Sequence, residues 1–216
     1  MNPLRILITA GPTIEFIDPV RFISNRSTGQ MGYELARLAK KKKYKVTLIS
    51  GPVSLLPPGG VRHFRVETAR QLNKKVRAEL KKADILVMAS AVCDFRPIYS
   101  LNKKIKSRHN IVLKLVKNPD IVGSLAKKEK RNKILVGFAL ETENLIKNAR
   151  GKLKKKALDL IIANKLDRTN MPFGGGLKTV YILGRHGFKK SVKKATKKRI
   201  ARAILDTIDE LCYTPN

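Results

Sequence analysis

Apolar and polar positions along this chain fall into two patterns that alternate. Short apolar runs predict strands, because a strand buried on both faces needs no polar positions. Longer stretches with apolar residues three or four positions apart predict amphipathic helices. The expected strands are residues 4–9, 44–50, 62–66, 84–92, 110–117, 134–139, 158–163 and 179–183, and the expected helices are residues 31–42, 67–83, 118–128, 141–156 and 194–211.

The order of these elements indicates the fold class. Strand and helix alternate, which predicts an α/β fold with a doubly wound, Rossmann-like parallel sheet. Residues 84–92, DILVMASAV, form a nearly continuous apolar run and are the expected central strand. The alternation breaks after that strand, because residues 93–108 show no helical period. With 216 residues and 43% hydrophobic content the chain can bury one core, so we expect a single domain over residues 1–216, with 93–117 as an inserted β arm or flap.

The formal net charge of +31 is the strongest compositional signal, and it invites a nucleic-acid hypothesis. The lysines are spread along the chain, however, and most lie where helix ends or outer helix faces are expected. A nucleic-acid site also needs aromatic residues among clustered basic ones, and only 6% of the residues are aromatic. A lysine-rich solvated surface is the simpler explanation. No specific nucleic-acid partner is expected, although such a field would attract phosphorylated metabolites.

Cysteine usage and the N-terminal pattern indicate the compartment. Cys93 and Cys212 stand far apart without metal-ligand spacing, so they are expected to be free thiols of a reducing cytoplasm. The N-terminus enters a strand within a few residues and has no signal-peptide core, and no apolar run approaches the ~18 residues of a membrane span. The sequence therefore predicts a soluble, cytoplasmic protein without a membrane partner.

Residues 18–32, DPVRFISNRSTGQMG, lie between the first strand and the first helix and carry the strongest candidate chemistry. In an open α/β sheet such a segment borders the crevice where ligands bind, and the helix N-terminus offers unpaired N–H groups to an anion. Serine, threonine and asparagine side chains supply small polar groups, and two glycines permit close approach to the backbone. A simple N-cap behind a flexible loop remains the alternative.

The known nucleotide-binding patterns do not fit this loop. It contains neither the dinucleotide pattern GxGxxG nor the Walker A pattern GxxxxGK[ST]. A dinucleotide-dependent reductase, which would share the fold, also needs an acidic residue at the end of its second strand, where this chain has Ser50-Gly51-Pro52. A reductase is therefore disfavoured.

Polar residues also follow the later strands, at Asp94, Glu141 and Asn164. The carboxyl ends of parallel strands meet at one edge, so these side chains are expected to face one crevice. Lys152 and Lys156 stand four residues apart and share a helix face, from which both could reach one phosphate chain. Each residue alone could equally be a cap or a surface charge. Their common edge is what indicates a site.

Segments distributed over almost the entire chain resemble one enzyme family. In order, they are ITAGPTIEFIDPVRFISNRSTGQMGYELA, VTLISGPV, SAVCDFRP, KIK, KLVKNPDIV, VGFALET and DLIIANK. The chain is similar in these segments to the bacterial phosphopantothenate–cysteine ligases, also called phosphopantothenoylcysteine synthetases. DPVRFISN and KNPDI make the resemblance specific, because they are not generic nucleotide-binding patterns.

The resemblance implies a reaction of coenzyme A biosynthesis. A nucleoside triphosphate, CTP in most bacterial members and ATP in some others, activates the carboxylate of 4′-phosphopantothenate as an acyl-nucleotide with release of pyrophosphate. The amine of L-cysteine then displaces the nucleoside monophosphate. Mg²⁺ is expected to accompany the triphosphate and to be held largely by its oxygens, so no protein metal site is expected.

The resemblance also bears on organisation. In many bacteria this activity is the C-terminal half of a bifunctional protein whose N-terminal half is a flavin-dependent decarboxylase. The sequence shows no such half, so we expect the stand-alone type of ligase. Family members are dimers with the inserted strands at the interface, so a homodimer through residues 93–117 is expected.

The resemblance assigns roles to individual residues. Asn25 matches the asparagine that handles the acyl-nucleotide, Arg21 the arginine of the same motif, and Lys104 the lysine needed for activation. The expected nucleotide-binding residues are Met88, Ala89, Ser90, Asp94, Lys104, Asn118, Pro119, Asp120, Ile121, Val122, Phe138, Lys152 and Lys156. The residues expected near phosphopantothenate are Asn25, Ser27, Gly29 and Gly32.

Two departures from the family pattern concern the nucleotide site. Ser90 and Cys93 stand where alanine is commoner, close to the expected position of the base. CTP is expected over ATP, but these residues leave the preference open. The stretch FGGGLKTV also lacks the acidic and asparagine residues that usually follow this FG, so no role is carried over to that loop.

Overall fold

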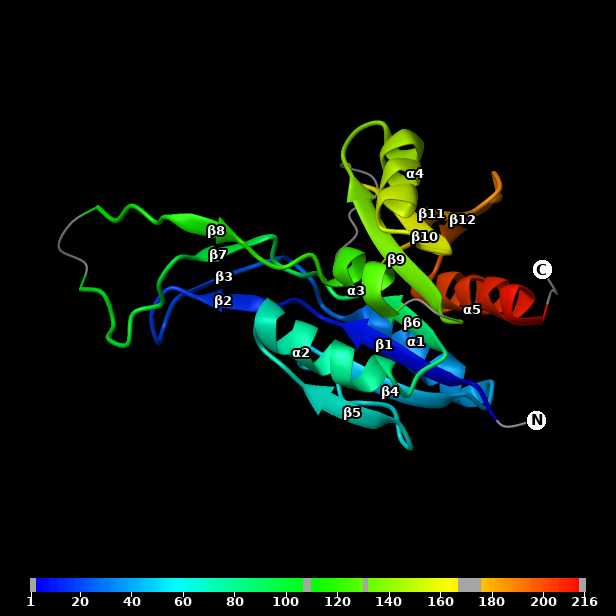
Figure 1. Cartoon of the computed structure of the whole chain (residues 1–216), viewed down its shortest axis with the longest axis horizontal. Helices are drawn as coiled ribbons and strands as arrows, with labels where there is room; N and C mark the ends of the chain where they lie inside the picture. Colours follow the sequence, from blue (N-terminus) through cyan, green and yellow to red (C-terminus); the bar gives the residue numbers. More distant parts are fainter. Residues whose placement is uncertain (1–2, 107–109, 130–131, 167–175, 214–216) are drawn as a thin grey trace.

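The computed structural model describes residues 3–106, 110–129, 132–166 and 176–213. The central sheet is built from β1 (Arg5–Ala10), β4 (Lys45–Ser50), β5 (Arg62–Arg65), β6 (Ile85–Met88), β9 (Ile134–Glu141), β10 (Leu160–Lys165), β11 (Lys178–Gly184) and β12 (Lys189–Ala195). Their order across the sheet is β12-β11-β10-β9-β6-β1-β4-β5 (Figure 1). The structure therefore has one continuous sheet through its centre.

The parallel part of this sheet is doubly wound. The chain starts in the middle at β1 and moves outward through β4 to β5, then returns to place β6 beside β1 and continues through β9 to β10. The predicted fold class is confirmed. One correction is needed, because β11 and β12 pair antiparallel and make the sheet mixed rather than wholly parallel. The winding reverses between β1 and β6, and this reversal leaves a crevice at their carboxyl ends.

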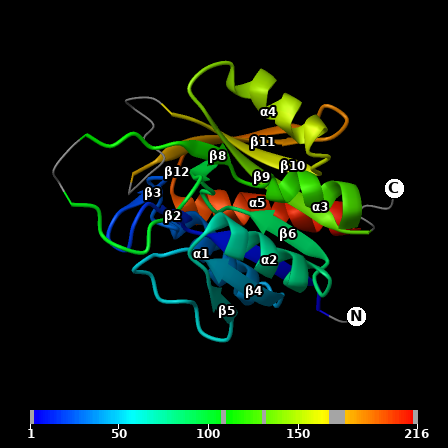
Figure 2. The same cartoon turned by 60° about the vertical axis from the view of Figure 1, so that its left-hand side comes forward.

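Helices cover both faces of the sheet (Figures 1 and 2). One face carries α1 (Gln30–Lys41) and α5 (Lys197–Tyr213), which pack on each other, and the other carries α2 (Ala69–Leu80), α3 (Ile121–Glu129) and α4 (Leu145–Lys155). Successive residues of β1 point into different layers, since Ile6 and Ile8 join the first core and Leu7 joins the second. This alternation explains why Ile6, Leu7 and Ile8 are all apolar.

Two short ribbons extend from the carboxyl edge of the sheet (Figure 1). One pairs β2 (Ile14–Phe16) with β3 (Phe22–Ser24), and the other pairs β7 (Phe95–Pro97) with β8 (Leu115–Lys117). We call the two ribbons and the connection 98–114 between β7 and β8 the arm. Residues 93–117 were expected to form an insertion by themselves, and the structure adds the first ribbon to it. Residues 107–109 of this insertion lie outside the described ranges.

Several predicted boundaries were wrong for identifiable reasons. The expected strand 84–92 ends at Met88, because the following residues bond to the turn after β1, with Ala91 N–H donating to Gly11 O at 2.9 Å. The expected helix 141–156 begins only at Leu145, because Glu141 still pairs with β10. The expected strand 110–117 is paired only over β8. The expected helices 67–83, 118–128 and 194–211 correspond to α2, α3 and α5, whose ends lie at other residues than predicted.

The strand β12 was not predicted. Its sequence KKSVKKA has only Val192 and Ala195 buried, and lysines occupy most of its other positions. This is typical of an edge strand, where exposed charge prevents further pairing. Residues 171–175 of the expected glycine-rich loop lie outside the described ranges. No helix in the described part of the chain is long and apolar enough to cross a membrane.

Candidate active site

A cavity of about 650 Å³ opens at the carboxyl edge of the parallel strands. Its wall comes from residues 24–31, the loop after β6, the ends of β9 and β10, the start of β11 and the first turn of α5. It therefore lies where the winding of the sheet reverses, which is the usual ligand position in open α/β sheets. We take this cavity as the candidate active site.

The structure brings some of the predicted residues to this cavity and leaves others outside its wall. The predicted residues that line it are Asn25, Ser27, Gly29, Ala89, Ser90, Asp94, Phe138 and Asn164. The predicted residues that do not line it are Arg21, Gly32, Met88, Lys104, residues 118–122, Glu141, Lys152 and Lys156. The second group lies in the arm, against the sheet or around α3 and α4, as described below.

The N-terminus of α1 opens directly into the cavity. Its N-cap residue Gly29 has a left-handed backbone with φ of 74°, and no side chain caps the helix. The first-turn N–H groups are therefore available to an anion. Gly32 instead packs α1 onto β1, because a Cβ at this position would lie 2.5 Å from that of Ala10. Its role is close packing, which brings the helix N-terminus to the sheet edge.

Hydrogen bonds fix the loop after β6 against the neighbouring segments. The Asn25 side-chain amide donates to Val92 O at 2.9 Å and to Ala91 O at 3.4 Å, so it joins residues 24–31 to this loop. Ser90, the departure noted in the sequence, has its hydroxyl 2.8 Å from that of the buried Thr9. A serine is accommodated here because Thr9 supplies the hydrogen-bond partner that an alanine would not need.

Asn118 ties the segment before α3 to the same loop. Its backbone N–H donates to Asp94 O at 2.8 Å, and its side-chain amide donates to Cys93 O at 2.9 Å. Its side-chain oxygen is buried and has no hydrogen-bond partner among the residues that the structure describes. An unsatisfied buried acceptor carries a desolvation cost of about 1–3 kcal/mol, which a donor on a bound ligand would relieve.

Lys152 and Lys156 are both paired with carboxylates. Lys156 Nζ lies 3.0 Å from Asp120 Oδ1, and Lys152 Nζ lies 2.7 Å from Glu141 Oε1. Burial raises the pKa of Asp120, but hydrogen bonds from Lys156 and the Gly123 N–H outweigh it, so the pKa lies below its ordinary value. Lys152 lies in α4 and Lys156 is the C-cap residue of that helix, and a phosphate would have to compete with these ion pairs for the two lysines.

In the arm, Asp18 joins the two ribbons. Its fully buried carboxylate accepts the N–H groups of Val20 and Arg21 at 2.8 Å and of Ile105 at 3.1 Å, together with the Arg21 guanidinium at 2.7 Å. Burial alone would raise the pKa of Asp18, but these donors lower it from 3.8 to about 2. Arg21 is thereby committed to the arm, and Lys104 is exposed beside Ile105.

Sequence reasoning missed two lysines that line the cavity, Lys178 and Lys197. Lys178 is the first residue of β11 and only 7% of its surface is exposed. Lys197 is the first residue of α5, and its ammonium donates to Gln30 Oε1 at 2.8 Å. The sequence could have indicated Lys178, because this lysine stands two residues before the apolar run VYIL. It did not stand out, because the chain contains so many lysines.

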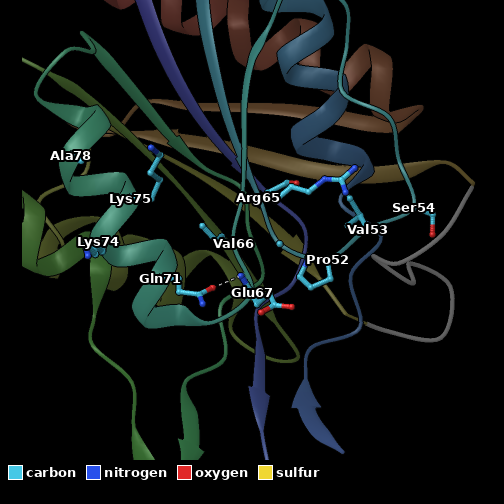
Figure 3. Close-up of a pocket in the computed structure, with 12 residues that line it drawn as sticks. Pro52, Val53, Ser54, Arg65, Val66, Glu67, Gln71, Lys74, Lys75 and Ala78 are labelled. Carbon is cyan, nitrogen blue, oxygen red and sulfur yellow. Dashed lines mark hydrogen bonds between the residues drawn. The ribbon is translucent and has the colours of Figure 1, made fainter. Parts of the chain in front are cut away.

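A larger hollow of about 1060 Å³ lies beside the ends of β4 and β5 and α2 (Figure 3). Its cations do not require a ligand. Arg65 and Lys74 are exposed to solvent, and Lys75 is partnered, since its ammonium lies 3.3 Å from Glu79 Oε1 and 3.3 Å from the centre of the Phe64 ring. The hollow is therefore a solvated basic surface and a weaker candidate than the cavity at the switch point.

Comparison with known proteins agrees with this geometry. Residues 1–211 match the family described as DNA/pantothenate metabolism flavoprotein C-terminal domain. Over 204 residues the chain is 42% identical to the coenzyme A biosynthesis bifunctional protein CoaBC of Borreliella burgdorferi, covering 93% of this chain and 51% of that protein. Over 215 residues it is 40% identical to a cysteine/cysteine sulfinic acid decarboxylase of an unknown prokaryotic organism, covering 99% of this chain and 60% of that protein.

A solved structure is similar along the whole chain. The crystal structure of the C-terminal domain of the bifunctional protein CoaBC superposes with a TM-score of 0.84 and 35% identity, covering 98% of this chain and 97% of that one. The chain thus spans 51% and 60% of the two relatives above but nearly all of this domain. The family resemblance seen in the sequence is confirmed, and the chain belongs to the DNA/pantothenate metabolism flavoprotein C-terminal domain family.

Proposed function

We propose that this protein is a phosphopantothenate–cysteine ligase of coenzyme A biosynthesis. It joins 4′-phosphopantothenate to L-cysteine and forms 4′-phosphopantothenoylcysteine, a nucleoside monophosphate and pyrophosphate. One observation carries the proposal: Asn25, Ser27 and Gly29 of the specific sequence motif line one cavity together with the loop after β6 and Phe138. Family membership and the likeness to the C-terminal domain of CoaBC support it.

The chemistry requires two steps. A carboxylate is a poor electrophile, so its oxygen first attacks the α-phosphorus of the nucleotide and displaces pyrophosphate. The cysteine amine then attacks the acyl carbon, loses a proton and displaces the nucleoside monophosphate. Both steps build negative charge on oxygen, and a preorganised site with N–H donors and cations stabilises that charge.

Individual roles follow from the motif and the geometry. Asn25, whose amide borders the cavity, handles the acyl-nucleotide, and Lys104 with Arg21 serves the activation step. Asp94 and Phe138, which line the cavity, contact the nucleotide together with residues 118–122, Lys152 and Lys156. CTP is the expected nucleotide. Mg²⁺ is expected to be held mainly by the oxygens of the triphosphate. The described lining residues include one carboxylate, Asp94, which is too few for a metal site made by the protein alone.

The arm supports a proposal about assembly. It exposes apolar side chains that include Phe22, Phe95, Tyr99, Val112 and Leu115. Exposed apolar surface of this extent, away from the core, is typical of an interaction site. We therefore propose that the protein is a homodimer that pairs through the arm, and that Lys104 acts either after the arm closes or in the cavity of the second copy.

The test is pyrophosphate release from CTP and, separately, from ATP, in the presence of magnesium and 4′-phosphopantothenate, with and without cysteine. Release that needs phosphopantothenate, with amide product only when cysteine is added, is the expected result and identifies the nucleotide. Absence of release with both nucleotides at low and high salt would reject the ligase.

A further inference from the structure

Lys178 is a largely buried lysine in the wall of the candidate active site. It is 7% exposed, and among the described residues its ammonium has no hydrogen-bond acceptor or ion-pair partner. A buried charge without compensation is costly, and such groups in folded proteins are normally paired. The side chain lines the candidate active site, so a ligand in the cavity is the group positioned to pair with it.

The antiparallel turn of the sheet is what places Lys178 there. β11 runs opposite to β10, so the first residue of β11 lies at the carboxyl edge of the parallel strands, where Asn164 of β10 pairs with Val180. The pairing of β11 with β12 shifts register between Lys178 and Val180. Both residues line the cavity. The position of this lysine is thus fixed by backbone pairing rather than by a flexible loop.

Lys197 adds a second charge in an unfavourable position. It occupies the first turn of α5, and its ammonium contacts Gln30, the first residue of α1. A cation at a helix N-terminus opposes the helix dipole, and here it faces two such ends. Burial and the charge of Lys178 both lower the pKa of Lys197. The charged residues of the described cavity wall are Arg26, Lys178 and Lys197 against Asp94, three positive and one negative.

We propose that Lys178, Lys197 and the uncapped first turn of α1 form a subsite for the phosphate oxygens of a bound substrate. The three elements converge on one cavity, and in the described part of the chain neither Lys178 nor the first turn of α1 has a negatively charged partner. This inference rests on the proposed function for the source of the phosphate. The nucleoside triphosphate and 4′-phosphopantothenate share the chemistry, and the experiment distinguishes them.

The test measures binding of inorganic pyrophosphate, CTP and 4′-phosphopantothenate by calorimetry at fixed ionic strength. The variant is Lys178→Met, and the matched control is Lys193→Met, which removes an exposed charge from the adjacent β12. Lys178→Met should weaken pyrophosphate binding about tenfold or more, the loss expected for one charged hydrogen bond, and Lys178→Arg should retain most of it. Lys193→Met should change it less than about twofold.

The two substrates identify the occupant. Weaker CTP binding with unchanged phosphopantothenate binding assigns the subsite to the nucleotide, and the reverse result assigns it to phosphopantothenate. Pyrophosphate affinity in Lys178→Met equal to that of Lys193→Met would overturn the subsite. Thermal unfolding without ligand checks that the variant folds. Lys178→Met removes a buried charge, so its melting temperature should be equal to or higher than that of the unmodified protein. A lower melting temperature together with unchanged pyrophosphate affinity would mean that Lys178 has a structural role only.

The proposed subsite and the proposed ligase activity can be rejected independently of each other. Pyrophosphate binding does not depend on turnover, so its loss in Lys178→Met would establish the subsite even if the unmodified protein made no amide. Conversely, an active ligase whose pyrophosphate affinity is indifferent to Lys178 would reject the subsite and leave the proposed function intact.

Discussion

Single side chains at the sheet edge divide into those that hold the site together and those that face the cavity. Asn25 does both, since its amide nitrogen bonds to Val92 O while the residue lines the cavity. Lys104 does neither in this arrangement, because it is exposed in the arm. The two residues proposed for different half-reactions therefore occupy different places, which makes their roles separable.

We predict that Asn25→Ala still releases pyrophosphate but stalls before amide formation. Lys104→Ala should instead lose pyrophosphate release by about a hundredfold or more, the cost of removing one transition-state donor. Single-turnover assays that follow pyrophosphate and amide separately make the measurement. Lys103→Ala, a change of the neighbouring exposed lysine, is the control and should retain both steps. Finding the Asn25 and Lys104 variants blocked at the same step contradicts this division.

The Asp18 carboxylate predicts a pH dependence of stability. Its pKa is lowered from 3.8 to about 2 in the folded protein, so its contribution is fully present above about pH 4 and is lost as the pH falls towards 2. Asp18→Asn should lower the melting temperature at pH 7, and the difference from the unmodified protein should shrink between pH 4 and 2. Asp206→Asn, at an exposed ion pair with Lys42, is the control. A difference that stays constant over this range would contradict the prediction.

At the scale of the elements, the parallel sheet could be predicted from the sequence because burial on both faces leaves apolar runs such as residues 6–8 and Ile85–Met88. The strands β2, β3 and β7 were not predicted, because three-residue strands carry too few positions for a period to show, and of the second ribbon only the strand that contains β8 was expected. Lys178 was missed because a buried lysine contradicts the pattern that identifies strands, and the irregular pairing of β11 is a tertiary effect.

Helix α1 gives a prediction with an internal control. Gly32→Ala should destabilise the fold by about 1–3 kcal/mol, because its new Cβ would meet Ala10 Cβ at 2.5 Å and Thr9 O at 2.8 Å. The same change at Gly151 in α4, where nothing lies within 4 Å, should stabilise by about 0.5–1 kcal/mol through helix propensity. Urea unfolding measures both. Equal effects of the two changes would show that packing against β1 is not the reason for Gly32.

At the scale of the whole molecule, the arm and the net charge have opposite effects on self-association. Exposed apolar residues of the arm favour association, whereas a net charge of +31 makes copies of the chain repel each other. Salt screens that repulsion, since the Debye length falls to about 8 Å at physiological ionic strength. Association should therefore be stronger at moderate than at very low salt.

We predict a mass of twice 24.2 kDa by light scattering at physiological salt. Val112→Asp places a charge on an arm residue that is 87% exposed, and it should make the protein monomeric. Because the side chain is exposed, the monomer should still fold. Leu56→Asp is the control, because Leu56 is 84% exposed but lies outside the arm. A monomeric unmodified protein, or a dimer insensitive to Val112→Asp, would mean that the arm does not mediate self-association.

The bonding of the two ribbons has a mechanical consequence. They are joined to each other by Asp18 and Ile105, and Asn25 and Asn118 bond them to the loop that follows β6. Two ribbons that are bonded in this way are expected to move as one rigid unit. A displacement of the far end of the arm would then also reach the residues where the arm joins the loop after β6. We therefore expect a partner that binds the far end of the arm to change the position of the Asn25 amide at the cavity wall.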